Sequence, residues 1–208
     1  MRAFLSALVL ILACASCGDD GGGVADAGGG DDGGRPRRDS GGGTDSGGGS
    51  DAGGGVDSGP ACSPMATPIP GCRPAVAPST GDPRQDCVDR INRFRAECQC
   101  LPPLARWNDG EACADMHAQY DSERRVAHAG FRDNICSPRG NAQNECPGWG
   151  SIPMIISGCL QLMWDEGPGE PFEEHGHYLN MSSTRFSMVA CGFYTTPGGE
   201  IWAVQNFR

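Results

Sequence analysis

The tract from residue 18 to residue 60 constrains this chain more than any other sequence feature. It holds 19 of the chain's 33 glycines, nine aspartates and three arginines, so it offers almost no side chain for burial. Because so little apolar surface cannot offset the conformational entropy lost on ordering, we predict a disordered Gly/Asp/Ser linker at 18–60. Gly-rich chains behave as flexible coils, so the linker is expected to act as a tether. The residues after it are numerous enough for one folded domain.

Charge excludes several classes of function. The part from Ala61 onward has 17 acidic and 12 basic residues. This balance argues against a nucleic-acid partner, because neutralising phosphates requires clustered cations. All 16 basic residues are arginine, and the chain contains no lysine. Schiff-base chemistry, lysine general bases and P-loop phosphate binding are therefore excluded.

The first 17 residues have the pattern of a signal peptide with a lipobox. Arg2 supplies a positive charge, and an apolar run of signal-peptide length follows, which is too short to span a bilayer. The Leu-Ala pair directly before Cys14 favours Cys14 as the lipid attachment site, as in bacterial lipoproteins. An even count of the remaining cysteines favours Cys17 as the alternative. We expect export to the bacterial cell envelope, either lipid-anchored to a membrane surface or secreted after ordinary signal cleavage.

Residues 61–85 form a Pro- and Cys-rich segment ahead of the domain, which we expect Cys62 and Cys72 to staple. At its end, Asp82 followed by Pro83 predicts a helix start, and the helix should run to about Cys98. Apolar residues at helical spacing predict one buried stripe, with the charged residues elsewhere. The stripe comprises Cys87, Ile91, Phe94 and Cys98, and the charged residues are Arg84, Asp89, Arg93 and Arg95.

Three further elements complete the predicted fold. Asn108 with Glu111 three residues later matches a capping box and predicts a polar helix. The apolar stretch from 153 to 164 predicts a short buried helix. Two segments rich in Val, Phe, Tyr and Trp, 186–195 and 200–207, flank a Thr-Pro-Gly-Gly turn and predict a β-hairpin. Helices first and antiparallel strands last indicate an α+β fold class.

The cysteines indicate an oxidising compartment. Ten of them follow the linker, so five disulfides are predicted, and a reducing cytosol would not keep these bonds oxidised. Zinc knuckles are the alternative, but the ten cysteines after the linker include no Cys-x-x-Cys pair. The spacing does not fix the disulfide connectivity.

Histidines and carboxylates form the only credible site in this sequence. His117 is expected on a polar helix face without a function. His175 is interpreted as a solvated loop residue, or else as a ligand in place of His177. Taken by themselves, His128 and His177 favour a pair of structural imidazoles that join a helix to a strand.

The order of several short sequence words resembles that of the CAP superfamily, also called SCP domains, which includes cysteine-rich secretory proteins, antigen 5 and pathogenesis-related proteins. The similarity covers roughly Asp86 to Arg208, so we assign 86–208 as a CAP domain. The words are Asn92-Arg93-Phe94-Arg95, Leu101-Pro102-Pro103-Leu104 with Trp107, His128, Asn144-Glu145, Trp164-Asp165-Glu166, Gly176-His177-Tyr178, Ala190-Cys191-Gly192 and Val204-Gln205-Asn206-Phe207.

This resemblance implies an α-β-α sandwich with a cleft that holds two histidines and two helical glutamates. By position, these tetrad residues are His128, Glu145, Glu166 and His177. The resemblance makes His128 and His177 the metal contacts, with the glutamates closing the site. Zn²⁺ is the expected ion, since imidazole nitrogen and carboxylate oxygen are both normal ligands for it.

Three neighbours of the tetrad depart from the family pattern. Cys146 follows Glu145 where the family usually has Asn, and Asn180 stands where Gln usually occurs. Met163 occupies the place of the Trp in Trp-x-x-Glu. Because outer residues orient metal ligands, these departures bear on the geometry of the site.

The function expected from these features is a non-enzymatic module at the cell surface. It would bind a lipid, a sterol or a partner protein through the cleft and the adjoining apolar surface. We assign no catalytic residue. A metal-assisted hydrolase that uses the same cleft is the first alternative, and a catalytically idle envelope scaffold is the second.

Overall fold

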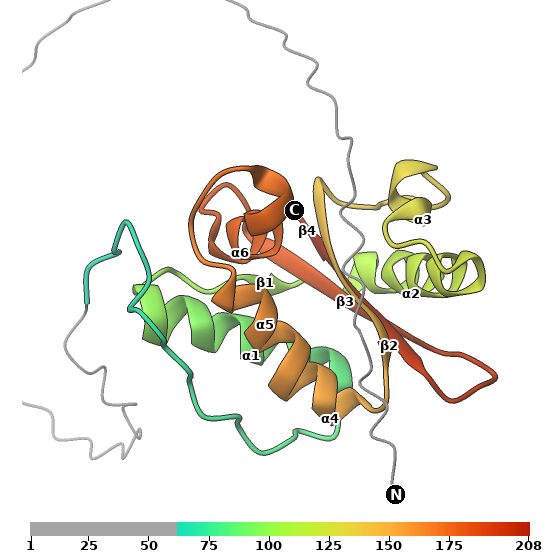
Figure 1. Cartoon of the computed structure of the whole chain (residues 1–208), viewed down its shortest axis with the longest axis horizontal. Helices are drawn as coiled ribbons and strands as arrows, with labels where there is room; N and C mark the ends of the chain where they lie inside the picture. The colour runs from blue at the N-terminus through green and yellow to red at the C-terminus, as the bar shows by residue number, and fades with distance from the viewer. Residues whose placement is uncertain (1–61) are drawn as a thin grey trace, which may run out of the picture. The chain divides into compact units, whose positions relative to one another are not determined.

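The computed structural model of the chain describes residues 62–208 (Figure 1). The predicted signal peptide at 1–17, the acylated Cys14 or Cys17 and the linker at 18–60 lie outside the described residues. The described part combines helices with one four-stranded sheet, so the predicted α+β class is confirmed. None of the helices after residue 61 is long and apolar enough to cross a bilayer.

Helical segments make up the two outer layers of the domain. Figure 1 shows α2 and α3 on one side of the sheet and α1, α4 and α5 on the other. The segments are α1 (Pro83–Arg93), the π-helical η1 (Phe94–Cys98), α2 (Asn108–Arg124), α3 (Ala129–Arg132), α4 (Ile152–Met154), the π-helical η2 (Ile155–Cys159), α5 (Leu160–Asp165) and α6 (Phe172–Ser182).

The sheet separates two apolar clusters. Along the last strand, Trp202 and Val204 pack on Ala114 and Ala118 of α2, while Ala203 and its neighbours on the other face join the larger cluster with α1 and α5. This alternation follows from the two-residue period of a strand. The strands are β1 (Ala105–Arg106), β2 (Ala142–Trp149), β3 (Met188–Thr195) and β4 (Ile201–Phe207), in the order β1-β3-β4-β2.

The predicted hairpin is confirmed, and one strand was missed. β3 and β4 are antiparallel and joined by a turn in which the Thr196 N–H donates to the Glu200 carbonyl at 2.8 Å. β2, antiparallel to β4, carries the tetrad residue Glu145 and had not been predicted as a strand. Its residues 143–145 are polar, yet all are buried, so the usual alternation of apolar and polar residues is absent.

The first predicted helix is confirmed as α1 followed by η1. The Asp82 side chain accepts a hydrogen bond from the Arg84 N–H at 2.9 Å and caps the helix. All four residues of the predicted stripe are fully buried.

The sequence had predicted that Arg95 lies outside the buried stripe with the other charged residues of this helix, and this is wrong. It is 1% exposed, and its guanidinium donates to the carbonyls of Pro102, Met181 and Ser183 at 2.7–2.9 Å. Burial lowers its pKa to about 10, so it stays protonated at neutral pH. Arg95 therefore joins η1 to the end of α6.

The helix predicted from Asn108 is α2, but the predicted capping box is wrong. Trp107 occupies the N-cap position and makes no side-chain cap, while the Glu111 carboxylate accepts from Arg106 at 2.6 Å. The helix is also less exposed than its polar sequence implied. The backbone of Gly192 in β3 lies so close to Ala114 that a Cβ at this glycine would collide with it.

The predicted buried helix at 153–164 is confirmed as α4, η2 and α5, whereas α6 had not been predicted. Trp164 of α5 joins η1 to α6. Its ring stacks on Phe94 with 5.3 Å between ring centroids and meets the edge of Tyr178 at 5.0 Å. α6 is thereby held over α5, with His177 beside the aromatic core.

The prediction of five disulfides is confirmed. Cys62 and Cys72 do staple the segment before α1, and both bond to the end of the first helix. Another bridge joins α1 to β3 across the core. The pairs are Cys62–Cys100, Cys72–Cys98, Cys87–Cys191, Cys113–Cys136 and Cys146–Cys159.

Candidate functional site

The structure brings the four tetrad residues together as two His–Glu pairs that face each other. The imidazole rings of His128 and His177 lie 6.4 Å apart, centroid to centroid. His128 precedes α3, Glu166 follows α5 and His177 lies in α6. Glu145 lies in β2, so the expectation that both acids would be helical is wrong for this residue.

The Glu166 carboxylate holds His177 at two points. Oε1 lies 2.5 Å from the His177 Nδ1, and Oε2 accepts the backbone N–H of His177 at 3.0 Å. An ionised carboxylate only accepts hydrogen bonds, so Nδ1 carries the ring proton. In the neutral imidazole of His177, the lone pair that can bind a metal is therefore on Nε2.

His128 is fixed in the same tautomer by a neutral group. Its Nδ1 lies 2.7 Å from the Gln143 Oε1, which is an acceptor, so the free lone pair is again on Nε2. Its backbone N–H donates to the Glu145 Oε2 at 2.7 Å, which holds the left-handed conformation of this residue at φ 61°. Burial lowers the pKa of His128, so the neutral form dominates at pH 7.

Glu145 faces a second buried acid, Asp121 of α2. Oδ2 of Asp121 and Oε1 of Glu145 find no donor among the described residues, and the two side chains are within hydrogen-bond reach of each other. Burial raises the pKa of both carboxyl groups, and the charge of Asp121 raises that of Glu145 further. Two buried carboxyls in contact share a proton, as in other carboxyl pairs.

Gln143 connects His128 of the cleft to a histidine of α2, on the face of the sheet that α2 covers. Its Nε2 donates to the His117 Nδ1 at 2.9 Å and to the Asn206 Oδ1 at 3.1 Å. His117 is fully buried, so the prediction that it would lie on a polar helix face is wrong. Burial lowers its pKa to about 4, and it is neutral at pH 7 with its proton on Nε2.

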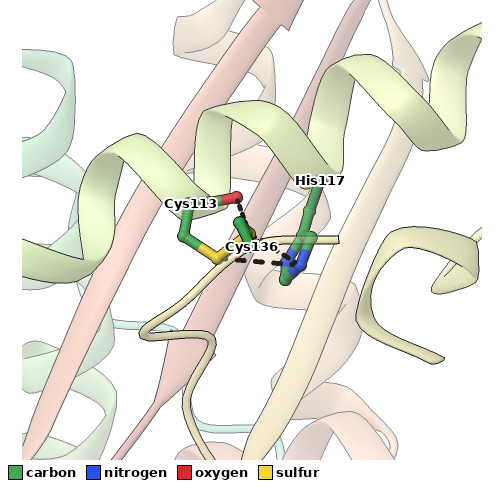
Figure 2. A group of neighbouring side chains, drawn as sticks. All are labelled: Cys113, His117 and Cys136. Atoms are coloured by element: carbon green, nitrogen blue, oxygen red, sulfur yellow. Dashed lines mark hydrogen bonds between the residues drawn. A yellow bond between two sulfur atoms is a disulfide. The ribbon is translucent and has the colours of Figure 1, made fainter. Parts of the chain in front are cut away.

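Figure 2 shows what the His117 Nε2 faces, which is the Cys113–Cys136 disulfide. The nitrogen lies 3.2 Å from the Cys136 Sγ and 3.7 Å from the Cys113 Sγ. These three residues form a compact group of metal-ligand types within residues 62–208. The sequence had pointed to none of the three as a site. The only signal was the helical spacing of four between Cys113 and His117.

Comparison with known proteins identifies the family. The profile of the cysteine-rich secretory protein family, CAP, matches residues 88–207. The chain belongs to the CAP family. The resemblance inferred from the motifs is therefore confirmed.

Solved structures resemble the CAP chain at low identity. The structure of BmVAL-1 is 17% identical with a TM-score of 0.43, over 67% of this chain and 80% of that one. The crystal structure of Na-ASP-1 is 16% identical with a TM-score of 0.41, over 70% of this chain and 43% of that one. A comparison with curated proteins gives no significant match.

The three residues that depart from the CAP pattern each have a structural role. The Asn180 Nδ2 donates to the Asn144 Oδ1 at 2.9 Å, and Asn144 donates to the His177 carbonyl at 3.0 Å. Asn180 thus holds α6 on β2 behind the cleft. Cys146 is oxidised with Cys159, and Met163 is buried in the core.

The interpretation of His175 as a solvated loop residue is wrong. It lies in α6, and its Nδ1 is 2.8 Å from the Glu166 carbonyl and 3.0 Å from the Gly167 carbonyl. These contacts stabilise the bend after α5. Its role is to shape the segment that carries Glu166.

One hollow of the CAP domain lies away from the tetrad. It has a volume of about 320 Å³ and lies between the segment before α1, α1 itself and the α4–η2 turn. Its wall is mainly apolar, and two arginines and two aspartates of α1, Asp86 and Asp89, also line it. The residues that matter here are Val76, Pro78, Ile152, Ile156, Arg90 and Arg93.

Proposed function

We propose that this CAP domain binds a divalent metal ion, zinc in the first place, through the Nε2 atoms of His128 and His177. One observation carries the proposal. Each Nδ1 is held by an oxygen acceptor, at 2.7 Å for His128 and 2.5 Å for His177. Zinc-binding histidines characteristically donate their other ring N–H to a carboxylate or carbonyl oxygen, which fixes the ligating tautomer.

The distance between the rings also fits this proposal. Two imidazoles on one tetrahedral ion have centroids about 5 Å apart, given Zn–N bonds of about 2 Å. The observed 6.4 Å therefore requires the rings to approach by about 1 Å. Both side chains are 34% exposed, so a side-chain rotation on the solvent side can bring them together.

Metal binding is better supported than hydrolysis. A metal-assisted hydrolase needs a carboxylate that is free to take a proton from water. Glu145 is buried and engaged with the His128 backbone, and Glu166 accepts from the ring and backbone of His177. We therefore infer a non-enzymatic role in which the ion contributes to ligand binding.

The proposed ligand is a lipid, a sterol or a partner protein, and one feature favours a lipid. The apolar hollow beside α1 has a volume at the lower end of the range for small-ligand sites, about 300–1,000 Å³. The apolar wall suits an acyl chain, whereas Arg90 and Arg93 are already bonded to Gln161 and Glu97. A fluorescent fatty acid that fails to bind at defined stoichiometry would remove this support.

The disulfide-rich CAP domain fits an extracellular or secreted protein. We propose in addition that the N-terminus anchors it to a membrane of the bacterial envelope through a lipid on Cys14, or on Cys17. Intact mass of membrane-extracted protein should show two or three acyl chains at one of these cysteines. A soluble mature form without acyl mass would contradict the anchor.

Zinc titration tests the metal site. Zn²⁺ should raise the melting temperature at pH 7.5, because a ligand at 100 times its Kd stabilises the folded state by about 2.7 kcal/mol. The effect should fade below about pH 6.5 as imidazoles protonate. The double variant His128→Ala, His177→Ala should lose the response, whereas Glu173→Gln, at an exposed acid of α6, should keep it. A parental response in the double variant would eliminate the site.

A further inference from the structure

A second group of metal-ligand side chains lies between α2 and the segment before β2, and Gln143 links it to His128 (Figure 2). Cys113 and His117 are one turn apart on α2, so both point to the same side of the helix. Cys136 comes from the segment between α3 and β2. The two Sγ atoms and the His117 Nε2 all lie within 4.8 Å of one another.

In the present oxidised state, the two sulfurs are bonded to each other and are not free to bind metal as thiolates. His117 contributes an Nε2–H that faces both sulfurs, at 3.2 Å and 3.7 Å. This geometry stabilises a thiolate when one of the sulfurs leaves the bond, because an N–H donor favours the charged sulfur. The histidine therefore lies where it can assist the opening of the disulfide.

The disulfide is accessible from one side. Cys136 is half-buried on a segment outside regular secondary structure, whereas Cys113 is 3% exposed. Thiol–disulfide exchange depends on access to the attacked sulfur and on stabilisation of the leaving sulfur. An external thiolate would reach Cys136 and expel Cys113, which is the sulfur inside the domain beside His117.

We propose that the Cys113–Cys136 disulfide gates a second metal site, which forms when a dithiol reductant opens the bond. The reductant's first thiolate bonds to the Cys136 sulfur, and the Sγ–Sγ bond breaks. Its second thiol then displaces Cys136. The reductant leaves as a disulfide, and the two electrons and two protons remain on Cys113 and Cys136.

The reduced group is a Cys₂His ligand set for a soft ion such as Zn²⁺ or Cu⁺. The Cα atoms of the two cysteines are 5.5 Å apart, so side-chain rotation allows both sulfurs to reach one ion. Binding displaces the two thiol protons. The ring proton of His117 moves from Nε2 to Nδ1, where the Gln143 Nε2 donates at 2.9 Å and the Asn206 Nδ2 at 3.4 Å in the oxidised state. Both carboxamides therefore turn over together, so that an amide oxygen accepts a hydrogen bond from the new Nδ1–H.

The test uses the full chain with His128→Ala and His177→Ala, so the cleft makes no contribution. Graded dithiothreitol followed by alkylation and mass spectrometry shows which cysteines open. We expect Cys113 and Cys136 to become alkylated while the bridges between buried sulfurs, Cys87–Cys191 and Cys146–Cys159, stay closed. If Cys113 and Cys136 open only when the domain unfolds, the proposal is overturned.

Metal binding is then measured on the oxidised and the partly reduced protein by competition with a chromophoric zinc chelator. The reduced form should bind one Zn²⁺ at least about 100-fold more tightly than the oxidised form, and zinc should block alkylation of Cys113 and Cys136. Co²⁺ in place of zinc should give a sulfur-to-cobalt charge-transfer band. Equal zinc affinity in the two redox states would contradict the gate.

Variants assign the ligands. His117→Gln should weaken zinc binding to the reduced form roughly 100-fold, because losing a ligand costs at least as much as losing an outer partner. Cys113→Ser with Cys136→Ser should abolish the cobalt band. Cys62→Ser with Cys100→Ser removes the most exposed bridge and should leave both signals intact. Loss of the cobalt charge-transfer band in this control alone would place the metal site at Cys62 and Cys100. Circular dichroism checks that each variant is folded.

Discussion

At the scale of single residues, the two cleft histidines differ in what holds their Nδ1 atoms. His177 has a carboxylate partner, Glu166, whereas His128 has the neutral carboxamide of Gln143. A charged acceptor makes an imidazole the more basic ligand. The two rings therefore make unequal contributions to any ion that they share.

This difference predicts the effect of neutralising Glu166. Glu166→Gln should lower zinc affinity by about 10–100-fold, the usual cost of losing an outer carboxylate partner. Isothermal titration calorimetry at pH 7.5 measures the change. Glu173→Gln, on an exposed acid in the first turn of α6, is the matched control and should bind zinc like the parent. An unchanged affinity in Glu166→Gln would show that this contact does not prepare the ligand.

Glu145 predicts a pH dependence of stability. Its pKa is raised in the folded state by burial and by Asp121, so the folded state holds a proton that the unfolded state releases above about pH 4.5. Stability from this group is therefore present at low pH and is lost as the pH rises towards the raised pKa. Glu145→Gln keeps an acceptor for the His128 N–H and removes the ionisation.

The unfolding free energy of Glu145→Gln should therefore exceed that of the parent at pH 8, and the difference should shrink towards pH 4. Urea denaturation at the two pH values measures this difference. Glu123→Gln on the exposed side of α2 should show no such trend. A constant difference between pH 4 and pH 8 would mean that Glu145 and Asp121 do not share a proton.

At the scale of elements, the close approach of α2 to the sheet depends on glycine in β3. A Cβ at Gly192 would collide with the backbone of Ala114 and Asp115, and backbone cannot rotate out of the way. Gly192→Ala should destabilise the domain by about 1–3 kcal/mol, the usual cost of overpacking. Thermal unfolding measures this change. Gly198→Ala in the turn of the same hairpin, with 3.8 Å to the nearest atom, should be close to neutral, and equal effects of both changes would contradict the close contact.

How much of the fold could be predicted depended on local signals. α1 follows from its cap and its apolar spacing, and the hairpin from its turn residues. β2 has no such pattern, because Gln143, Asn144 and Glu145 are buried through contacts with distant elements. α6 was missed because Gly176 lies in its middle and its first turn has no side-chain cap.

The candidate site, too, could be predicted only in part. The tetrad residues came from the order of family words, and their convergence is a property of the fold. The roles of Asp121, Gln143 and His117 depend on contacts between α2, β2 and β4, which no spacing in the sequence records. The closed group of Cys113, His117 and Cys136 likewise joins residues from two separate segments.

At the scale of the whole molecule, the bridges differ in the length of chain that they close. Cys87–Cys191 spans 104 positions and ties α1 to β3, whereas Cys146–Cys159 spans 13. The loop-entropy model gives about 4–5 kcal/mol for the longer loop and about 3 kcal/mol for the shorter one. Cys87→Ala with Cys191→Ala should therefore lower the unfolding free energy more than Cys146→Ala with Cys159→Ala. The reverse order in guanidinium denaturation would contradict this ranking.

The Cys62–Cys100 bridge has a mechanical consequence under the proposed N-terminal anchor. A pull on the polypeptide ahead of Cys62 passes through the sulfur–sulfur bond directly to Cys100. The covalent path bypasses everything between these two positions, including α1 and η1. A force applied through the N-terminal segment would therefore not unfold α1 or η1. It could not lengthen that segment by pulling residues 63–99 out of the domain.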